Sequence, residues 1–234
     1  MTKKILITGA NGQLGHEMRN ALKGNNRFEC IFTDVAELDI CNAEAVKQII
    51  ADNHIDYIVN CAAYTQVDKA EDNAELCKKI NTDAVENLAR AAATYGARMI
   101  HISTDYVFNG RGYRPYTEDV VPDPQSVYGS TKLEGEKILT DICPESIIIR
   151  TAWLYSPYGN NFVKTMLHLG EEREELSVVA DQIGTPTCAA DLAQAILVIL
   201  QADTFVPGTY HFSDEGACSW YDFTVTIHRL AGIT

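Results

Sequence analysis

Short apolar runs alternate with longer segments of helical period along most of the chain. The runs of strand length cover 3–8, 28–33, 56–60, 98–103 and 146–150, and the helical segments cover 12–23, 43–51, 73–94 and 126–140. Further apolar stretches lie at 176–179, 189–200 and 210–213, and a last helix is predicted from 219 to 234. Because this alternation is typical of βαβ units, the sequence predicts an α/β fold with a doubly wound parallel sheet. A long loop over 108–125, with three prolines, is expected to be functional rather than filler.

The composition limits the partners that the protein can have. The 234 residues are 46% hydrophobic and 22% charged, enough to bury the core of one domain or of a domain with an appendage. A net charge of −13 argues against nucleic acid or an anionic membrane as a partner. Seven scattered cysteines without a CxxC pair predict neither a disulfide framework nor a zinc site. Because no apolar segment is long enough for a signal peptide or a membrane span, we expect a cytoplasmic protein.

The turn after the first predicted strand carries the first candidate chemistry. Gly9, Gly12 and Gly15 in TGANGQLG follow the strand and open a helix, which is the context of a Rossmann dinucleotide-binding fingerprint. These glycines permit a tight turn, an approach of the backbone to a pyrophosphate, and close packing of the helix on the strand. The free N–H groups of the helix then face the phosphates, so an acidic protein can hold a dinucleotide without a basic surface. The other candidate cofactor contacts in this turn are Asn11, Gln13 and Leu14.

Acidic side chains after the second predicted strand indicate which dinucleotide is bound. Asp34 lies nineteen residues after Gly15, where a carboxylate can accept hydrogen bonds from both hydroxyls of the adenosine ribose. A 2′-phosphate there would meet like-charge repulsion, so we expect NADH or NADPH with NADH weakly favoured, since Arg27 or a loop could still supply a cation. Asp39 and Ile40 would reach the adenine, and a cap of the following helix is an equal alternative for Asp39.

The third predicted strand ends in small side chains, in the segment NCAAYT. Small residues let the cofactor backbone pass close over the sheet edge, although tight helix packing would select the same residues. The candidate cofactor contacts in this segment are Cys61, Ala62, Ala63, Tyr64 and Thr65.

A tyrosine and a lysine four residues apart are the candidate catalytic pair. Tyr128 and Lys132 form a YxxxK motif on one face of a predicted helix. An ammonium beside a phenol lowers the pKa of the phenol from about 10, so Tyr128 is expected to exchange a proton with substrate. Thr104 ends the fourth predicted strand, where its hydroxyl can hydrogen-bond a carbonyl that is being reduced. Lys132 would also bind the nicotinamide ribose.

Several segments resemble one family of the extended short-chain dehydrogenase/reductase superfamily. The G-x-x-G-x-x-G spacing is typical of the superfamily, and ITGANGQLG, VNCAAYTQVDKAE, HISTDYVFNG, YGSTKLEGE, RTAWLYSPYGNNFVKTM and DQIGTPT together resemble the dTDP-4-dehydrorhamnose reductases. This resemblance runs from residue 3 to about 233. It implies NAD(P)H-dependent reduction of the 4-keto group of dTDP-4-dehydro-L-rhamnose to dTDP-L-rhamnose, for cell-surface polysaccharide such as lipopolysaccharide.

The same resemblance implies the domain organisation and the sugar contacts. Residues 1–150 would form the NAD(P)-binding Rossmann domain with the catalytic Tyr and Lys, and 151–234 the remaining Rossmann elements interleaved with a small, partial sugar-nucleotide-binding region. An aromatic plane after a strand end, as at Trp153, suits stacking on a sugar or a nicotinamide, and a core tryptophan is the alternative. The candidate substrate contacts are Val67, Thr104, Asp105, Tyr106, Trp153 and Asn161.

The resemblance also bears on three further points: a metal site, a homodimer and the length of the chain. Members of the family can dimerise through a metal held by acidic side chains, for which Glu17 is a matching position, but partner acids near Ala189, Ala190 and Asp191 are not convincing. We therefore expect no metal, and a homodimer stays open. Family members continue past the last predicted helix into a basic segment that helps complete the nucleotide-sugar pocket. Either this chain is shortened or the natural chain is short, and binding of thymidine diphosphate is expected to be incomplete.

Other functions on the same fold remain as alternatives. A 4,6-dehydratase would need a further acid and base, and its pattern after the strand threonine is Asp then Glu, whereas Asp105 is followed by Tyr106. A nucleotide-sugar epimerase would use the same Tyr and Lys without net redox change. A non-catalytic nucleotide-binding regulatory subunit, like the relative that partners methionine adenosyltransferase, would have no need of Thr104, Tyr128 and Lys132 together.

Overall fold

The computed structural model describes residues 2–233 and is built around one parallel sheet. Its strands are, in the order in which they pair, β2 (Phe28–Thr33), β1 (Lys3–Thr8), β3 (Tyr57–Asn60), β4 (Arg98–Thr104), β5 (Ile147–Thr151) and β9 (Gly208–His211). All five pairings are parallel. The chain steps outward from β1 to β2 and then returns to the other side of β1 with β3, so a topological switch point lies between β1 and β3. The predicted doubly wound parallel sheet is confirmed.

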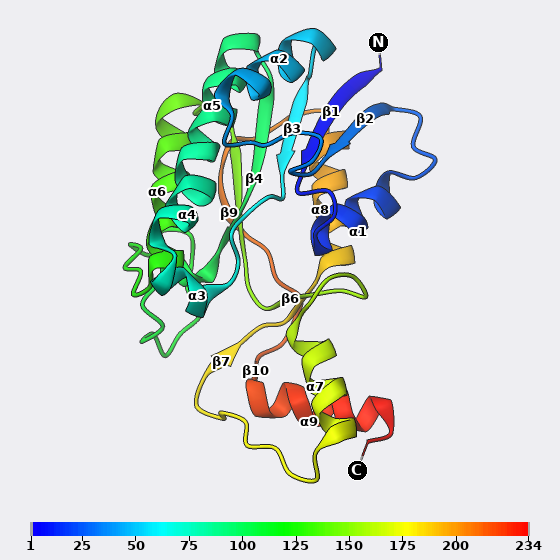
Figure 1. Ribbon diagram of the computed structural model, residues 1–234, viewed down its shortest axis with the longest axis vertical. Coiled ribbons are helices and arrows are strands. Elements are labelled where there is room, and N and C mark those ends of the chain that lie inside the picture. Colours follow the sequence, from blue (N-terminus) through cyan, green and yellow to red (C-terminus); the bar gives the residue numbers. More distant parts are fainter. Residues whose placement is uncertain (1, 234) are drawn as a thin grey trace.

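Helices cover both faces of this sheet (Figure 1). On one face lie α1 (Gln13–Leu22) and α8 (Ala189–Gln201), and on the other lie α2 (Ala43–Asn53), α5 (Ala84–Tyr95) and α6 (Val127–Ile142). Successive residues of β1 feed the two cores, as the period of a strand requires. Ile5 and Ile7 pack in the core that contains Met18 of α1, whereas Leu6 packs in the core that contains Ile50 of α2, and all are fully buried.

A smaller unit lies below the carboxyl ends of the strands (Figure 1). It consists of the parallel pair β6 (Leu154–Tyr155) and β8 (Thr187–Cys188), the antiparallel pair β7 (Ile183–Gly184) and β10 (Cys218–Ser219), and the helices α7 (Phe162–Glu172) and α9 (Trp220–Ala231). Helix α9 begins as predicted, because Ser219 and Asp222 form a reciprocal capping box. The last residue of the helix predicted there, Thr234, lies outside the described residues. Among residues 2–233, no helix is long and apolar enough to cross a membrane.

Two helices were missed, and three predicted elements differ in the structure. Helix α7 was not predicted, the apolar stretch 176–179 forms no helix or strand, and the stretch 210–213 is shifted, since β9 ends at His211. The long helix over 73–94 is interrupted. Its place is taken by α4 (Ala74–Lys78), the π-helical turn η1 (Lys79–Asp83) and α5, and the short helix α3 (Val67–Asp72), which was not predicted, precedes them.

The interruption at η1 has a tertiary cause. The side chain of Asn81 accepts a hydrogen bond from the backbone N–H of Tyr64 at 2.9 Å and donates one to the carbonyl of Tyr64 at 3.1 Å. The carbonyl of Asn81 also occupies the space that a side chain at Gly135 of α6 would need. Because Asn81 is held from both sides, the helix takes a π turn there instead of continuing regularly.

Candidate active site

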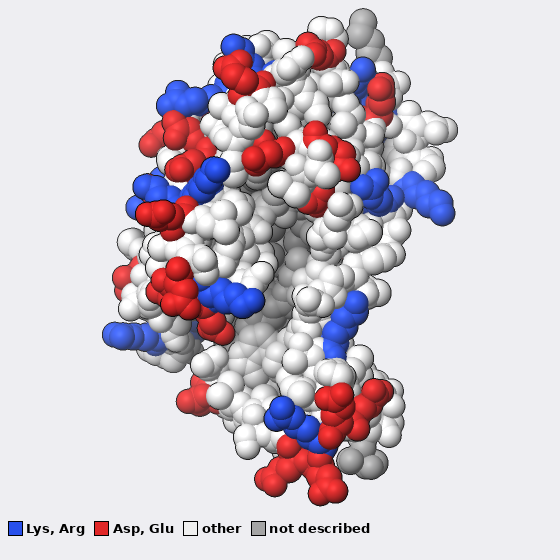
Figure 2. Space-filling model, viewed as in Figure 1, with Lys and Arg blue, Asp and Glu red and all other residues white. Residues whose placement is uncertain are grey.

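A cleft of about 1150 Å³ follows the carboxyl edge of the sheet, between the sheet and the smaller unit (Figure 2). Its walls come from the turn after β1, the ends of β2, β3 and β4, the helix α6 and residues 151–161. All predicted cofactor, catalytic and substrate residues line it except Tyr64, whose side chain packs with Ala70, Cys77 and Tyr128. The loop 108–125, expected to be functional, contributes no residue to this cleft.

The glycine turn is closed by contacts that only glycine permits. Gly9 has φ +64°, and a Cβ there would lie 2.7 Å from the backbone N and Cα of Ala62. A Cβ on Gly15 would lie 2.5 Å from the Cα of Ala10. The turn therefore lies directly against the end of β3. Gly12 occupies the N-cap position of α1, so no side chain caps that helix. The first N–H groups of α1 are thus left for a ligand, as an anion site at a helix N-terminus needs.

Asp34 joins the end of β2 to the glycine turn. Its Oδ2 accepts a hydrogen bond from the backbone N–H of Asn11 at 2.9 Å, and its Oδ1 accepts one from the N–H of Val35 at 2.8 Å. Each oxygen keeps a further lone pair for a ligand hydroxyl. Asp34 therefore shapes the turn as well as lining the cleft.

The cleft wall at residues 39–41 combines a buried apolar side chain with a turn that a side-chain hydrogen bond stabilises. Ile40 is buried, and Asp39 accepts a hydrogen bond from the N–H of Cys41 at 2.9 Å. The alternative that Asp39 caps the following helix is wrong, because Asn42 caps α2 by accepting a hydrogen bond from Ala45. The side chain of Asp39 stabilises the turn that precedes this cap.

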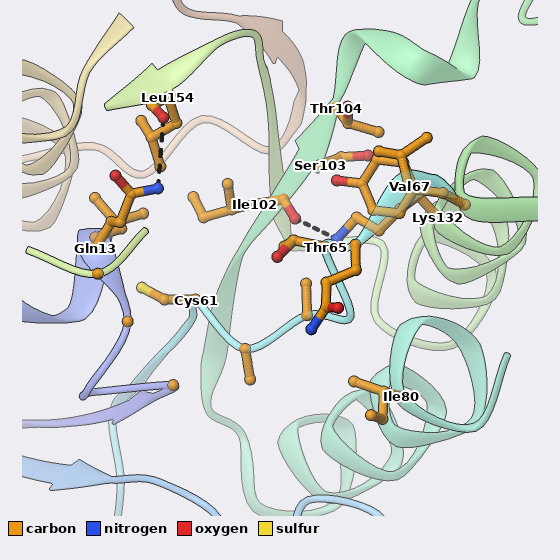
Figure 3. Close-up of a pocket in the computed structure, with 18 of the residues that line it drawn as sticks. Gln13, Cys61, Thr65, Val67, Ile80, Ile102, Ser103, Thr104, Lys132 and Leu154 are labelled. Atoms are coloured by element: carbon orange, nitrogen blue, oxygen red, sulfur yellow. Dashed lines mark hydrogen bonds between the residues drawn. The ribbon is translucent and has the colours of Figure 1, made fainter. Parts of the chain in front are cut away.

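The candidate catalytic pair is buried on one face of α6. Tyr128 is 9% exposed and its ring packs edge-on against the ring of Tyr106 at 5.5 Å. Burial raises the pKa of Tyr128, and a hydrogen bond with Thr104 only partly opposes this. The predicted lowering of that pKa by Lys132 is therefore wrong, because desolvation of the phenol dominates. The Lys132 amine is instead held by the carbonyl of Ile102, to which it donates a hydrogen bond of 2.6 Å (Figure 3).

Lys132 is the largest of the fully buried side chains, with 1% exposure. Burial lowers the pKa of its amine to about 8, while the negative charge of Glu136 opposes the change. An amine with this pKa changes its charge close to neutral pH, which is typical of functional sites.

Thr104 and Asp105 lie together at the end of β4. The Thr104 hydroxyl donates a hydrogen bond to Oδ1 of Asp105 at 3.1 Å and accepts one from the backbone N–H of Tyr106 at 3.2 Å. Burial raises the pKa of Asp105 to about 6. The end of β4 therefore offers a hydroxyl and a carboxyl beside the phenol of Tyr128.

Trp153 lies in the cleft, but another ring occupies one of its faces. Its indole stacks on that of Trp220 with ring centroids 3.4 Å apart, and a Cβ on Gly184 would lie 2.5 Å from its ring. Its backbone has φ +49°, a left-handed conformation that is rare for a bulky residue. One face of the Trp153 ring, which was predicted to stack on a ligand, is thus in contact with Trp220 of the smaller unit. The sequence spacing did not predict this contact.

Asn161 connects the smaller unit to the glycine turn. Its Oδ1 accepts a hydrogen bond from the N–H of Lys164 and caps α7, while its Nδ2 donates to Oε1 of Gln13 at 2.9 Å and to the carbonyl of Ser156 at 2.8 Å. The bond to Gln13 ties the first residue of α1 to the opposite wall of the cleft.

The structure adds lining residues that the sequence prediction missed. They are Val35, Leu38, Cys41, Gln66, Lys69, Leu76, Lys79, Ile80, Ile102, Ser103, Thr151, Ala152, Leu154, Gly159 and Asn160. Thr151 ends β5 and Ala152 follows it, and the rule that ligands bind at the carboxyl ends of parallel strands would have found them. Lys79 and Ile80 reach the cleft through the π turn η1, for which the sequence carries no signal.

Comparisons with known proteins agree on one family. The family model described as RmlD substrate binding domain matches residues 3–234. The chain is 41% identical to the spore coat polysaccharide biosynthesis protein SpsK of Bacillus subtilis, over 98% of this chain and 80% of that protein. A crystal structure of a dTDP-4-dehydrorhamnose reductase from Clostridium acetobutylicum is 52% identical, with a TM-score of 0.95 over 98% of this chain and 81% of that one. The enzyme of the same name from Bacillus anthracis, solved in complex with NADP, is 43% identical, with a TM-score of 0.95 over 100% of this chain and 82% of that one.

Proposed function

The chain belongs to the family of the RmlD substrate binding domain, and we propose that it reduces the 4-keto group of dTDP-4-dehydro-L-rhamnose to give dTDP-L-rhamnose with NAD(P)H. One observation carries this proposal: the Thr104 hydroxyl, the Tyr128 phenol and the Lys132 amine line the same cleft as an open glycine turn. The product is a precursor for cell-surface polysaccharide, in keeping with the name of the Bacillus subtilis relative.

The residues present fit a dinucleotide. The uncapped start of α1 offers N–H groups to a pyrophosphate, and the space at Gly12 has no side chain to fill it. The ribose and adenine would lie along Asp34 and Ile40, and the segment from Cys61 to Thr65 would border the pyrophosphate and nicotinamide ribose. In the proposed division of the chain, residues 1–150 carry these contacts, and 151–234 add further sheet elements and part of the sugar-nucleotide site.

Each catalytic residue has a distinct task in the reduction. NAD(P)H, when bound, supplies the hydride that adds to the carbonyl carbon of the sugar. Tyr128 donates its phenol proton to the carbonyl oxygen, so that C=O becomes CH–OH, and the Thr104 hydroxyl donates a hydrogen bond to the same oxygen as charge develops. The raised pKa of Tyr128 keeps the phenol protonated until that moment. Lys132 would hold the nicotinamide ribose beside it.

The sugar would lie between the end of β4 and the smaller unit. Asp105 and Tyr106 border that part of the cleft from β4, Val67 borders it from α3, and Trp153 and Asn161 face them from the other wall. The carboxyl of Asp105 suits hydrogen bonds to sugar hydroxyls, and the Trp153 indole suits contact with an apolar face of the ring.

The charges near Asp34 favour NADH over NADPH. Asp34 is followed by Val35, Ala36 and Glu37, and Glu37 accepts a hydrogen bond from the backbone N–H of Asp34 at 2.9 Å. A 2′-phosphate beside Asp34 would thus meet two carboxylates, which costs affinity by like-charge repulsion.

Binding titrations with both cofactors test this preference. We expect NADH to bind more tightly than NADPH, and Asp34→Asn to narrow the difference by about tenfold or more, because each 1.4 kcal/mol is a factor of ten. Asn26→Asp, an exposed charge change away from the cleft, should leave the ratio unchanged. Tighter binding of NADPH by the unmodified chain would refute the preference while leaving the proposed reduction intact.

The proposed reaction is tested by mixing the protein with NADH and the dTDP-linked keto sugar and following the absorbance of NADH. Stoichiometric loss supports reduction, whereas conversion of a nucleotide sugar without loss supports an epimerase, and tight NADH binding without either supports a regulatory subunit. Tyr128→Phe should lower kcat by about 100-fold or more with cofactor affinity unchanged, the scale of a lost general acid. Tyr113→Phe, at a tyrosine that is 92% exposed, is the matched control. An unchanged rate in Tyr128→Phe would remove Tyr128 from the mechanism.

A further inference from the structure

A line of buried polar side chains crosses the sheet and ends at Lys132. Thr8 on β1 donates a hydrogen bond from its hydroxyl to Oδ1 of Asn60 on β3 at 2.7 Å. Nδ2 of Asn60 lies 3.0 Å from Nδ1 of His101 on β4, and Nε2 of His101 lies 3.4 Å from Nζ of Lys132 on α6. None of these side chains is more than 1% exposed. The proposed reaction involves Lys132 but gives no role to Thr8, Asn60 or His101.

The backbone fixes which way the amide of Asn60 points. Oδ1 of Asn60 also accepts a hydrogen bond from the backbone N–H of Ala62 at 3.2 Å. A backbone N–H can only donate, so the oxygen of the amide must be on that side. The NH₂ group of Asn60 therefore faces His101, and Nδ1 of His101 must accept its hydrogen bond.

The tautomer of His101 follows from this acceptor. Burial holds the pKa of His101 well below its usual value, so the ring is neutral. A neutral imidazole that accepts at Nδ1 carries its proton on Nε2. The group that His101 turns toward the Lys132 amine is thus an N–H donor.

We propose that Asn60 and His101 are positioning residues that hold an N–H donor against Nζ of Lys132 and so favour the neutral amine over the ammonium. A neutral amine can accept from Nε2–H with its lone pair while it donates to the carbonyl of Ile102, whereas an ammonium would meet the donor as a repulsive neighbour. The consequence for catalysis rests on the proposed reduction: the charge of the catalytic lysine then changes within the working pH range.

The other ionisable groups around Lys132 act in the opposite direction. Glu136, one turn further along α6, and Cys77 on α4 both raise the pKa of Lys132, and burial lowers it. The effect of Glu136 is reduced because Arg150 on β5 pairs with it at 2.6 Å, with both side chains buried. The phenol of Tyr128 precedes Lys132 by one turn, and the carboxyl of Asp105 lies beside that phenol. The net value of about 8 reflects burial, which outweighs these acidic neighbours. The proposed donor from His101 would act in the same direction as burial.

The sharpest test reverses the tautomer. In Asn60→Asp, the atom that faces His101 becomes a carboxylate oxygen, which can only accept, so Nδ1 must carry a proton. In a ring that stays neutral, Nε2 then turns a lone pair toward Lys132 and stabilises the ammonium. Nitrogen-15 NMR of the histidine rings identifies the tautomer. Carbon-13 NMR of labelled lysine, with the Lys132 signal assigned by its loss in Lys132→Met, measures the pKa of the amine.

We expect the proton of His101 on Nε2 in the unmodified chain and on Nδ1 in Asn60→Asp, with the pKa of Lys132 raised by about one unit or more. Asn26→Asp adds the same charge at an exposed position and should move neither signal. A proton on Nδ1 in the unmodified chain overturns the proposal, and so does an unchanged or lowered pKa of Lys132 in Asn60→Asp. If the buried carboxylate prevents folding, the tautomer in the unmodified chain decides alone.

These measurements need neither cofactor nor substrate, so they separate this inference from the proposed function. The expected tautomer and pKa with no turnover of the keto sugar would refute the reductase and keep the role of His101. Turnover of the keto sugar by a protein whose His101 carries its proton on Nδ1 would support the reductase and refute the role of His101. Where both hold, the limb of the pH profile of kcat/KM that reports Lys132 in the free enzyme should shift in Asn60→Asp by the same amount as the pKa of the amine.

Discussion

The sheet domain and the smaller unit form the two walls of one cleft but are held together in different ways. The sheet domain has a core on each face, in which residues such as Ile7 and Leu88 are fully buried. In the smaller unit the most buried apolar side chains are Met166 of α7 and Ile227 of α9, with 8% and 7% exposure. The wall that would bind the cofactor therefore rests on a large apolar core, and the opposite wall does not.

Stacked aromatic rings hold the smaller unit in place. Trp220 lies against Trp153 at 3.4 Å and against Phe162 at 4.4 Å, and Phe223 adds contacts with Phe162 and Tyr155 at 5.7 Å. These rings come from α7, α9 and the segment after β5, so they hold together parts of the chain that are distant in sequence. We therefore expect the proposed cofactor binding to depend on backbone geometry, and the proposed sugar binding to depend on a few side-chain contacts.

The largest expected effect comes from filling the glycine turn. In Gly15→Val, the new side chain would collide with the backbone of Gly9 and Ala10, so the start of α1 must move away from the pyrophosphate position. NADH affinity should fall by about 100-fold or more, equivalent to about 2.8 kcal/mol. Gly24→Ala is the matched control, because open space surrounds that glycine and only the cost of its positive φ remains. Isothermal titration with NADH measures both, and an affinity in Gly15→Val within threefold of the original would contradict the assigned role of the turn.

A smaller effect, confined to the other wall, is expected from Trp220→Ala. Removing the ring leaves Trp153 and Phe162 without their stacking partner and should destabilise the smaller unit by about 2 kcal/mol. Amide exchange in α7 and α9 should become faster while NADH affinity stays within twofold. Leu230→Ala removes a side chain on α9 that is 80% exposed and should change neither. A large loss of NADH affinity in Trp220→Ala would show that the two walls are not independent.

The smallest effect is a pH dependence at Asp105, which lines the sheet wall of the cleft directly after β4. Burial raises the pKa of this carboxyl to about 6, so the folded protein binds more protons than the unfolded chain between about pH 4 and 6. Stability contributed by the protonated form is therefore lost as pH rises through that range. Asp105→Asn should be more stable than the original chain at pH 8, by on the order of 1 kcal/mol after allowance for solvent contact, with little difference at pH 4. Thermal melts at both pH values measure this stability difference. If Asp105→Asn differed from the original chain by the same amount at pH 4 and pH 8, titration of Asp105 could not be the cause.

Local patterns were enough to predict most of the sheet domain. The bounds of β1 and β2 were predicted to the residue, because an apolar run between turn residues marks a buried strand. The glycine turn and the YxxxK pair were each recognised from the sequence, because each depends only on spacing within one turn or one helix, and both line the cleft. The RmlD family and the reductases that it contains were also indicated by short segments of the chain.

What the sequence determined by itself was the set of short-range features: the periods of the elements, the glycines that permit the turn, and the side chains that share a helix face. Only the tertiary structure decided that Asn81 interrupts a helix to hold Tyr64, that Trp220 covers Trp153, and that burial raises the pKa of Tyr128. The same holds for the line from Thr8 to Lys132, whose members lie on three strands and a helix. The reason is physical: desolvation and contacts between distant segments depend on which residues the fold brings together, and no local spacing records that.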